Sequence, residues 1–404
     1  MPRTIKIPAP TLTEPKLETW TLKLKTITPL FGGSATPREV DPENPVRAAS
    51  VRGHLRFWWR AVAGAAEKLF EAEEAIWGSA EKHGKVALRV LEPNAGQPVR
   101  PSELVPDKGA AKTGPMERFF LHPFNENKRE GLPEASGLKS VEFTLELDVT
   151  QLSPEEKEQL KTALRAWIAF GGVGARTRRG VGALEALSDV SEWLPASPNQ
   201  LKAWFVVSPI AEPQHTTLAG AVICLGQPHK PNANDPYKGQ APWRELGRFW
   251  ARFRKGHFLE DPQTGQTMKY TPMAGGKWRD HQTLKNLGHH QQEVALVKPY
   301  LGLPIVYQRL GNSFSGTLEA PHPQGRRMAS PVILKPMAFA DGSLRPAVII
   351  LRAPAPEQIK IGGRELKLQL PEHDPVLDAL EAGDALEAVR KAARIQGFAV
   401  EVRL

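Results

Sequence analysis

Cysteine is almost absent from this sequence, and long apolar runs are absent altogether. Cys224 is the single cysteine among 404 residues, so the chain can form no internal disulfide and no cysteine-rich zinc site. No stretch approaches the ~18–20 consecutive apolar residues of a membrane-spanning helix. Residues 1–10 lack the apolar core and the cleavage site of a secretory signal. We therefore expect a cytoplasmic protein that makes no membrane contact.

Acidic residues are too few to balance the basic ones. The chain has 53 Lys plus Arg against 44 Asp plus Glu, which gives a formal net charge of +9. Such an excess favours a polyanionic partner such as nucleic acid, although thermophile surface chemistry or an acidic protein neighbour would produce the same number. Hydrophobic residues make up 41% of the chain, enough to bury real cores. The length predicts two or three domains at ~100–200 residues each.

Hydrophobic patterning predicts six elements in the first half. Period-two alternation marks the strands, Ser50 can cap the first helix, and Ser153-Pro154-Glu155-Glu156 is a strong start for the second. In chain order the expected elements are a strand at 20–31, a helix at 51–66, strands at 85–91 and 141–149, a helix from 154 to the Gly171-Gly172 pair, and a strand at 183–187. This βαββαβ order is typical of a ferredoxin-like unit.

The second half repeats that order. The expected elements are a strand at 203–210, a helix at 242–255 stopped by Gly256, a hairpin of 331–339 with 346–352, a helix at 375–394 broken at Gly383, and a strand at 398–404. We therefore predict an α+β fold of two tandem ferredoxin-like domains, residues 1–197 and 198–404. Long insertions are expected at 92–136, 212–241 and 256–330.

The first helices of the two halves share a short motif. Arg56-Phe57-Trp58-Trp59-Arg60 matches Arg248-Phe249-Trp250-Ala251-Arg252 at four of five positions. The preceding strands also end alike, in Thr28-Pro29-Leu30 and Ser208-Pro209-Ile210. Chance could produce a match of this length, but the common element order favours a duplicated domain.

Both helices carry arginines at intervals of four residues. In the first helix Arg52, Arg56 and Arg60 fall on one face, and Trp58 and Trp59 lie on the other. The second helix has Arg244, Arg248, Arg252 and Lys255 in a comparable stripe. Guanidinium groups pair well with phosphates, so phosphate contact is the functional interpretation, and a solvated basic face over an aromatic core is the structural alternative. The tryptophans are expected to be core residues.

A glycine- and arginine-rich loop occupies residues 171–182. Its glycines allow close backbone approach, and Arg176, Arg178 and Arg179 supply positive charge to what we expect to be a flexible anion-binding loop. It does not match a dinucleotide fingerprint, because it follows a helix and precedes a strand, and it lacks the Gly-Lys-Ser/Thr of a phosphate-binding P-loop. A plain surface loop is the alternative.

The histidines raise the question of nuclease or metal chemistry. His54 lies among the arginines of the first helix, where a general base for RNA cleavage could stand. His281, His289 and His290 match no known metal-binding spacing, so we expect no metal and no cofactor. The acid pair Glu73-Glu74 is expected to be helix surface.

Together these motifs resemble the RAMP superfamily, and in particular the family of large first subunits of type III-B CRISPR Cmr complexes. The resemblance rests on residues 29–33, 52–60, 76–78 and the glycine loop, and on two motifs of the second half at 301–305 and 326–331. The matching motifs occur in the same order along nearly the whole chain.

The resemblance implies a non-enzymatic RNA-binding subunit. It implies contact with the 3′ region of guide (CRISPR) RNA, with target single-stranded RNA as a further ligand, and assembly with other RAMP subunits. A metal-independent RAMP endoribonuclease that processes CRISPR RNA is the alternative. The candidate RNA-binding residues are Arg52, His54, Arg56, Arg60, Gly172, Gly174, Arg176, Arg178, Arg179, Gly180, Arg248, Arg252, Arg326 and Arg327.

Overall fold

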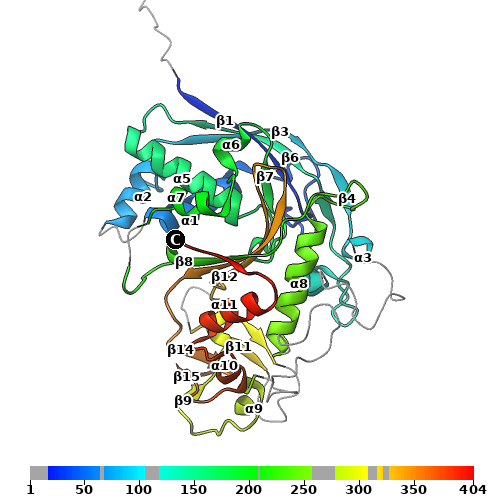
Figure 1. The fold of residues 1–404 in the computed structure, drawn as a ribbon, viewed down its shortest axis with the longest axis vertical. Helices are drawn as coiled ribbons and strands as arrows, with labels where there is room; N and C mark the ends of the chain where they lie inside the picture. Colours follow the sequence, from blue (N-terminus) through cyan, green and yellow to red (C-terminus); the bar gives the residue numbers. More distant parts are fainter. Residues whose placement is uncertain are drawn as a thin grey trace, which may run out of the picture.

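The computed structural model has a mixed α+β fold with several antiparallel sheets, which confirms the predicted class (Figure 1). It describes residues 17–63, 68–104, 118–207, 210–256, 278–307, 316–321 and 327–404. Within those ranges no helix is both long enough and apolar enough to cross a membrane.

The first half forms a four-stranded antiparallel sheet, here called the first-half sheet. Its strand order is β3-β6-β1-β7. The alternation in β1 buries Leu22 and Leu24 and leaves Lys23 exposed, as the sequence predicts. In chain order the elements are β1 (Thr19–Thr26), α1 (Ala48–Ala63), β3 (Ala87–Asn94), β6 (Glu142–Asp148), α5 (Pro154–Phe170) and β7 (Leu184–Ala186).

The start of α5 confirms the predicted helix signal. The Ser153 hydroxyl accepts a hydrogen bond from the Glu156 amide at 3.2 Å, and the Glu156 carboxylate accepts one from the Ser153 amide at 2.8 Å. This reciprocal capping satisfies two amide groups that the helix itself leaves without partners. It fixes the helix whose far end leads into the glycine loop.

The second half forms another four-stranded antiparallel sheet, here called the central sheet. Its order is β12-β13-β8-β16, so the strands take the same relative positions as in the first-half sheet. The predicted hairpin, the helix break at Gly383 and the closing strand are all present. In chain order the elements are β8 (Thr217–Leu225), α8 (Gln240–Lys255), β12 (Val332–Ala338), β13 (Leu344–Arg352), α10 (Pro375–Leu380), α11 (Ala385–Ile395) and β16 (Val400–Arg403).

The predicted strand at 203–210 is wrong. Pro198 stands at the first position of a short helix, α7 (Pro198–Trp204), and the first strand of the central sheet is β8, inside the segment predicted as an insertion at 212–241. Both faces of β8 are buried, so it reads as a continuous apolar run rather than as an alternating one. Alternation therefore misses it. Ser208 and Pro209 lie outside the described residues.

The layers of the molecule explain why the central sheet is so apolar. One of its faces, which includes Ile223 and Ile349, packs in a core with α1 and α5 of the first half. The opposite face, which includes Cys224 and Val348, packs in a second core with α8 and α11. The order is first-half sheet, α1 and α5, central sheet, then α8 and α11 (Figure 1). The two halves thus share a core.

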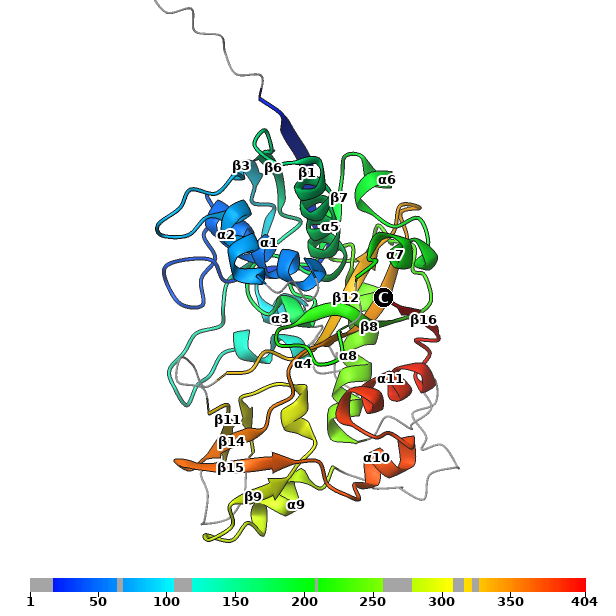
Figure 2. The ribbon, with the colours of Figure 1, turned by 90° about the vertical axis from the view of Figure 1, so that its left-hand side faces the viewer.

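A third sheet, here called the distal sheet, has the order β10-β11-β14-β15-β9. It lies at the end of the molecule opposite β1, β3 and β6 in both views (Figure 2). Its strands are β9 (Glu293–Ala295), β10 (Ile305–Val306), β11 (Thr317–Glu319), β14 (Gln358–Ile361) and β15 (Arg364–Gln369). The sequence patterning did not predict this sheet, because three of its strands have only two or three residues.

The remaining elements are short. A small sheet of order β2-β5-β4 comprises β2 (Leu30–Phe31), β4 (Gln97–Val99) and β5 (Gly137–Lys139). The helices are α2 (Leu69–Trp77), α3 (Pro101–Leu104), α4 (Arg118–Leu121), α6 (Val190–Trp193) and α9 (Asp280–Lys285), with 3₁₀ turns η1 (His122–Phe124), η2 (Thr177–Arg179) and η3 (Lys298–Leu301). The turn η2 lies within the glycine loop and leads to the candidate site.

Candidate nucleic-acid interface

Two of the three arginines in the stripe of α1 pair with a carboxylate of α2. Arg56 Nε and Arg60 Nη1 each lie 2.6 Å from Glu73 Oε1 of α2. Glu73 is only 5% exposed, so the expectation that it is helix surface is wrong, whereas Glu74 does pair with exposed Lys82. A buried carboxylate between two guanidinium groups holds α2 against α1. Arg56 and Arg60 therefore have a structural role, whatever else they contact.

The other face of each repeated motif is core, as predicted. Trp58 and Trp59 of α1 are each 2% exposed, as is Trp250 of α8. Trp58 packs beside Phe170 at the end of α5, with ring centroids 5.8 Å apart. The tryptophans thus position the two helices and leave the arginine faces turned away from the cores.

The glycine loop is fixed to the end of the first strand rather than flexible, which corrects the expectation. The Thr28 hydroxyl donates to the Gly180 carbonyl at 2.6 Å and accepts from the Ala183 amide at 2.8 Å. The amide of Ala175 donates to the Phe31 carbonyl at 2.8 Å. These hydrogen bonds give the loop one defined conformation.

The glycines of this loop are required by close contacts within the chain. Gly174 has φ +83° and Gly180 has φ +73°, and a Cβ at either position would lie 2.7 Å from a backbone carbonyl oxygen. At Gly180 that oxygen belongs to Leu334 of β12, in the other half. A Cβ at buried Gly172 would lie 2.6 Å from the Gly182 carbonyl oxygen. These positions admit no side chain for reasons of packing.

Two loop arginines connect the halves. Arg178 Nη1 donates to the Ser330 carbonyl at 2.5 Å, and Arg179 Nη1 donates to the Val332 carbonyl at 2.8 Å. The Arg178 guanidinium lies 5.2 Å from the ring centroid of Phe57 in α1, and that of Arg179 lies 4.9 Å from the ring centroid of Trp250 in α8. Adjacent residues of one loop therefore contact both copies of the repeated motif.

These arginines are crowded by other cations. Burial, and after it the charges of Arg176, Arg254 and Arg178 in that order, lowers the pKa of Arg179 to about 9. Burial also lowers the pKa of Arg178 to about 10. No carboxylate contributes to either pKa shift within the part of the chain that the structure describes. The site is a concentration of positive charge in a partly dry environment, where each charge interacts strongly.

The cationic cluster continues past α8 toward the distal sheet. Burial lowers the pKa of Arg254, and charges on Tyr307 and Asp280 oppose that change. Burial lowers the pKa of Lys298 to about 8, with Asp280 opposing and Arg254 reinforcing the shift. Asp280 is 1% exposed and accepts hydrogen bonds from the amides of Val297 and Lys298 at 3.0 and 2.8 Å. Its carboxylate thus anchors this end of the cluster.

The sequence did not single out Arg254, Lys298, Asp280 or the role of Glu73. Arg254 falls outside the four-residue spacing that defined the stripe of α8, and Asp280 follows a segment without clear periodicity. Arg254, Lys298 and Asp280 come together only because α8, η3 and α9 meet in the folded chain.

The remaining candidate residues lie at different points of the surface. Arg176 is exposed beside the crowded arginines, whereas Arg52 and His54 are half-buried on α1. Burial lowers the pKa of His54. Arg327 is exposed, and Arg326 lies outside the described residues. Arg248 and Arg252 line a separate cavity of about 320 Å³ beside α8.

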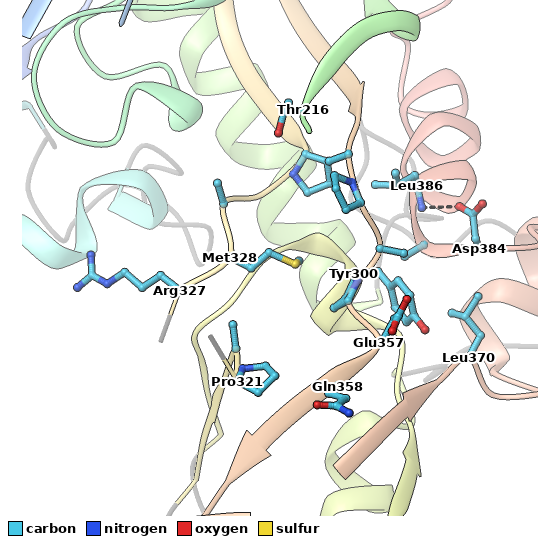
Figure 3. A pocket seen from close by; sticks show the side chains of 18 residues that line it. Thr216, Tyr300, Pro321, Arg327, Met328, Glu357, Gln358, Leu370, Asp384 and Leu386 are labelled. Carbon is cyan, nitrogen blue, oxygen red and sulfur yellow. Dashed lines mark hydrogen bonds between the residues drawn. The ribbon is translucent and has the colours of Figure 1, made fainter. Parts of the chain in front are cut away.

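A larger cavity of about 790 Å³ opens between the distal sheet and α11 (Figure 3). Its walls are mostly apolar, with four prolines and five alanines among the lining residues. Met328, Tyr300 and Glu357 lie around its middle, while Arg327 points away from the other labelled side chains. With so few charged groups facing inward, this cavity is a poor match for the backbone of a nucleic acid.

The described residues contain no group of three or more His, Cys, Asp or Glu side chains arranged to hold a metal ion. The one cysteine, Cys224, is buried in the central sheet, and burial raises the pKa of its thiol to about 12. It is therefore protonated and unreactive near neutral pH.

Comparison with known proteins gives this geometry a context. Residues 23–185 match the RAMP superfamily. The chain is 29% identical over 175 residues to the CRISPR system Cmr subunit Cmr1-2 of Pyrococcus furiosus, a match covering 40% of this chain and 91% of that protein. It is 27% identical over 156 residues to Cmr1-1 of the same organism, a match covering 37% of this chain and 43% of that protein.

Solved structures with a related chain show lower sequence identity. The apo crystal structure of Cmr1 from Pyrococcus furiosus matches with a TM-score of 0.46 and 18% identity, covering 84% of this chain and 89% of that one. A chain in the cryo-EM structure of the type III-B Cmr-beta complex bound to cognate target RNA matches with a TM-score of 0.45 and 13% identity. The match covers 93% of this chain and 99% of that one.

Proposed function

We propose that this chain, a RAMP superfamily protein similar to the Cmr1 subunits of type III-B CRISPR complexes, is a structural subunit that binds RNA and catalyses no reaction. Its RNA ligands are guide RNA, contacted in the 3′ region, and target single-stranded RNA. Its protein partners are other RAMP subunits of the same complex.

The observation that carries this proposal is the crowding of Arg176, Arg178, Arg179 and Arg254. They come from the glycine loop and α8, and their mutual repulsion helps to lower the pKa of Arg179. Placing like charges together costs free energy unless a polyanion neutralises them. A phosphate chain supplies several negative charges at once and would be held by guanidinium groups. Arg52 and His54 of α1, and Arg327, extend the proposed surface.

We also infer that each half is a ferredoxin-like domain, with the boundary at residues 197 and 198. The shared strand order and the βαββαβ sequence of β1-α1-β3-β6-α5-β7 and β8-α8-β12-β13-α11-β16 support this assignment. On this assignment the glycine loop of the first domain docks on the edge strand β12 of the second. The site then forms where two domains meet, a common place for ligand binding.

The first test is incubation of the purified protein with labelled CRISPR-repeat RNA in EDTA. The proposal expects RNA that is shifted on a native gel and remains intact. Discrete fragments ending in 2′,3′-cyclic phosphate would instead establish the metal-independent endoribonuclease. The absence of any shift at low salt would refute RNA binding.

The second test is Arg176→Ala, because Arg176 is exposed and its side chain is not needed to join the halves. We expect weaker RNA binding and a slope of log K against log salt that is shallower by about 0.7, the value for one lost phosphate contact on a single strand. The matched control is Arg89→Ala on the outer strand β3, whose side chain is 74% exposed. An equal loss of affinity in both variants would show only a non-specific charge effect.

A further inference from the structure

The cavity between the distal sheet and α11 has the size and the walls of a ligand pocket (Figure 3). Its volume of about 790 Å³ lies within the ~300–1,000 Å³ typical of such pockets. Met328, Leu370 and Leu386 line it and are each half-buried, and Tyr300 adds an aromatic ring. Water finds few hydrogen-bond partners on apolar walls, so a ligand with apolar faces would displace it favourably.

One wall of the cavity is a stiff connection between the central and distal sheets. The lining residues Ala353-Pro354-Ala355-Pro356 follow β13 and precede β14. Each proline fixes its own φ at about −65°, and each favours an extended conformation in the alanine before it. The wall is therefore preformed, and little conformational entropy is lost there when a ligand binds.

Two segments of the cavity wall also hold residues of the cationic cluster. The carbonyl of Ser330 accepts the hydrogen bond from Arg178, and the residues on either side of Ser330 line the cavity. Tyr300 lines it as well, and Lys298 of the cluster stands two residues earlier in η3. A ligand that is anionic in one part and apolar in another can therefore contact the cluster and the cavity together.

We propose that this cavity takes an unpaired base of the RNA whose phosphates are held by the cationic cluster. The inference deepens the proposed RNA-binding function, on which it rests, by assigning a site to the base. A base has two apolar faces and a polar edge. Its faces suit walls of alanine and proline beside the ring of Tyr300, and its edge can pair with the Gln358 amide, which also lines the cavity.

The charges around the cavity favour the base over the phosphate. Among the described lining residues, the carboxylates of Glu357 and Asp384 outnumber the one cation, Arg327. Arg327 also points away from the other labelled side chains (Figure 3). Two carboxylates repel a phosphate, whereas the crowded arginines of the glycine loop attract it. The backbone is thus expected to stay at the loop while the base enters the cavity.

The test fills the cavity without altering the cationic cluster. Ala355→Trp places a large side chain on an exposed residue of the wall, and Ala203→Trp on exposed Ala203 of α7 is the matched control. Binding of end-labelled oligoadenylate is followed by fluorescence anisotropy at several salt concentrations. Ala355→Trp is expected to weaken binding about tenfold, the effect of losing one stacked base, with an unchanged salt slope because no phosphate contact is lost. Ala203→Trp should leave affinity within about twofold.

Tyr300 provides a second measurement, which decides the matter if thermal unfolding shows that Ala355→Trp does not fold. Tyr300→Ala removes the ring and should weaken binding, whereas Tyr300→Phe keeps the ring and should bind as the wild type does. An oligomer of equal length whose sugars carry no bases should bind the wild type and Ala355→Trp equally. Repeat-derived RNA and target RNA, titrated separately, show which strand supplies the base, and either result supports the inference.

Equal affinity of folded Ala355→Trp and wild-type proteins for oligoadenylate overturns the inference and leaves the proposed function standing. If that variant also fails to associate with protein subunits, the occupant is an apolar protein segment. A loss of affinity accompanied by a shallower salt slope overturns the inference too, because the lost contacts would be to phosphates. Failure of the wild-type protein to bind RNA at all would instead overturn the proposed function itself.

Discussion

The helices α1 and α8 carry nearly the same five-residue motif and occupy different layers. α1 lies between the first-half sheet and the central sheet, whereas α8 covers only the outer face of the central sheet. The aromatic side of the motif is buried in both helices. In the first half its arginine side pairs with Glu73 of α2, and in the second half its arginine side lines a cavity. A repeated motif therefore specifies packing, while the neighbouring elements decide what its charges bind.

The largest effect is expected from the shared aromatic side. Trp58→Ala and Trp250→Ala should each lower the free energy of unfolding by ~3–5 kcal/mol, because each truncates a buried indole. Urea unfolding of both variants measures this. An unchanged midpoint accompanied by collapsed RNA affinity would make the tryptophans stacking platforms and would break the common core role of the two helices.

The next effect concerns the loop that joins both helices. Arg178→Ala and Arg179→Ala each remove a hydrogen bond to a backbone carbonyl of the other half and should each cost ~1–3 kcal/mol of stability. RNA affinity should fall as well, whereas Arg176→Ala should affect affinity alone. Thermal unfolding and filter binding on the three single variants separate the roles. Equal stability in all three would show that the loop does not connect the halves.

Glu73→Gln should remove the carboxylate that pairs with Arg56 and Arg60 of α1. We expect the free energy of unfolding to fall by about 1–2 kcal/mol. The effect is small for a buried ion pair because the Arg56 and Arg60 side chains are 32% and 35% exposed, so water replaces part of the contact. RNA binding should gain salt dependence as two charges are released. Glu71→Gln, whose side chain is 66% exposed on the same helix, is the control and should change neither quantity.

The smallest effect is expected at His54. Burial lowers its folded-state pKa, so the unfolded state binds the proton more readily and stability falls as the pH drops through the ordinary pKa of ~6.5. His54→Ala should reduce this pH dependence below about pH 6.5. It should change RNA affinity by less than about tenfold, or ~1.4 kcal/mol. RNA cleavage by the wild type that disappears in the variant would contradict the non-enzymatic role.

Local signals in the sequence predicted much of the fold. The cap at Ser153, the stop at Gly256 and the alternation in β1 act through neighbouring residues, so they can be read from the chain alone. The strand predicted at 203–210 failed because β8 is buried on both faces by elements distant in sequence. Much of the distal sheet was missed because β9, β10 and β11 have only two or three residues, too few for a periodic pattern.

The candidate site was predicted only in part. The composition of the glycine loop identified Arg178 and Arg179, but not that they donate to carbonyls of the other half. Glu73 was taken for surface because nothing in the spacing of α2 shows that two arginines of α1 enclose it.

The sequence by itself determined the excess of positive charge, the α+β class and the repeated motif, because these depend on composition and on contacts within a few residues. The tertiary structure alone decided that Arg56 and Arg60 share a buried carboxylate, that Arg176, Arg178, Arg179 and Arg254 crowd one another, and that Arg248 lines a cavity. Charges interact through space, and their free energy depends on burial and distance rather than on position in the chain. Two copies of one motif consequently acquired different electrostatic environments.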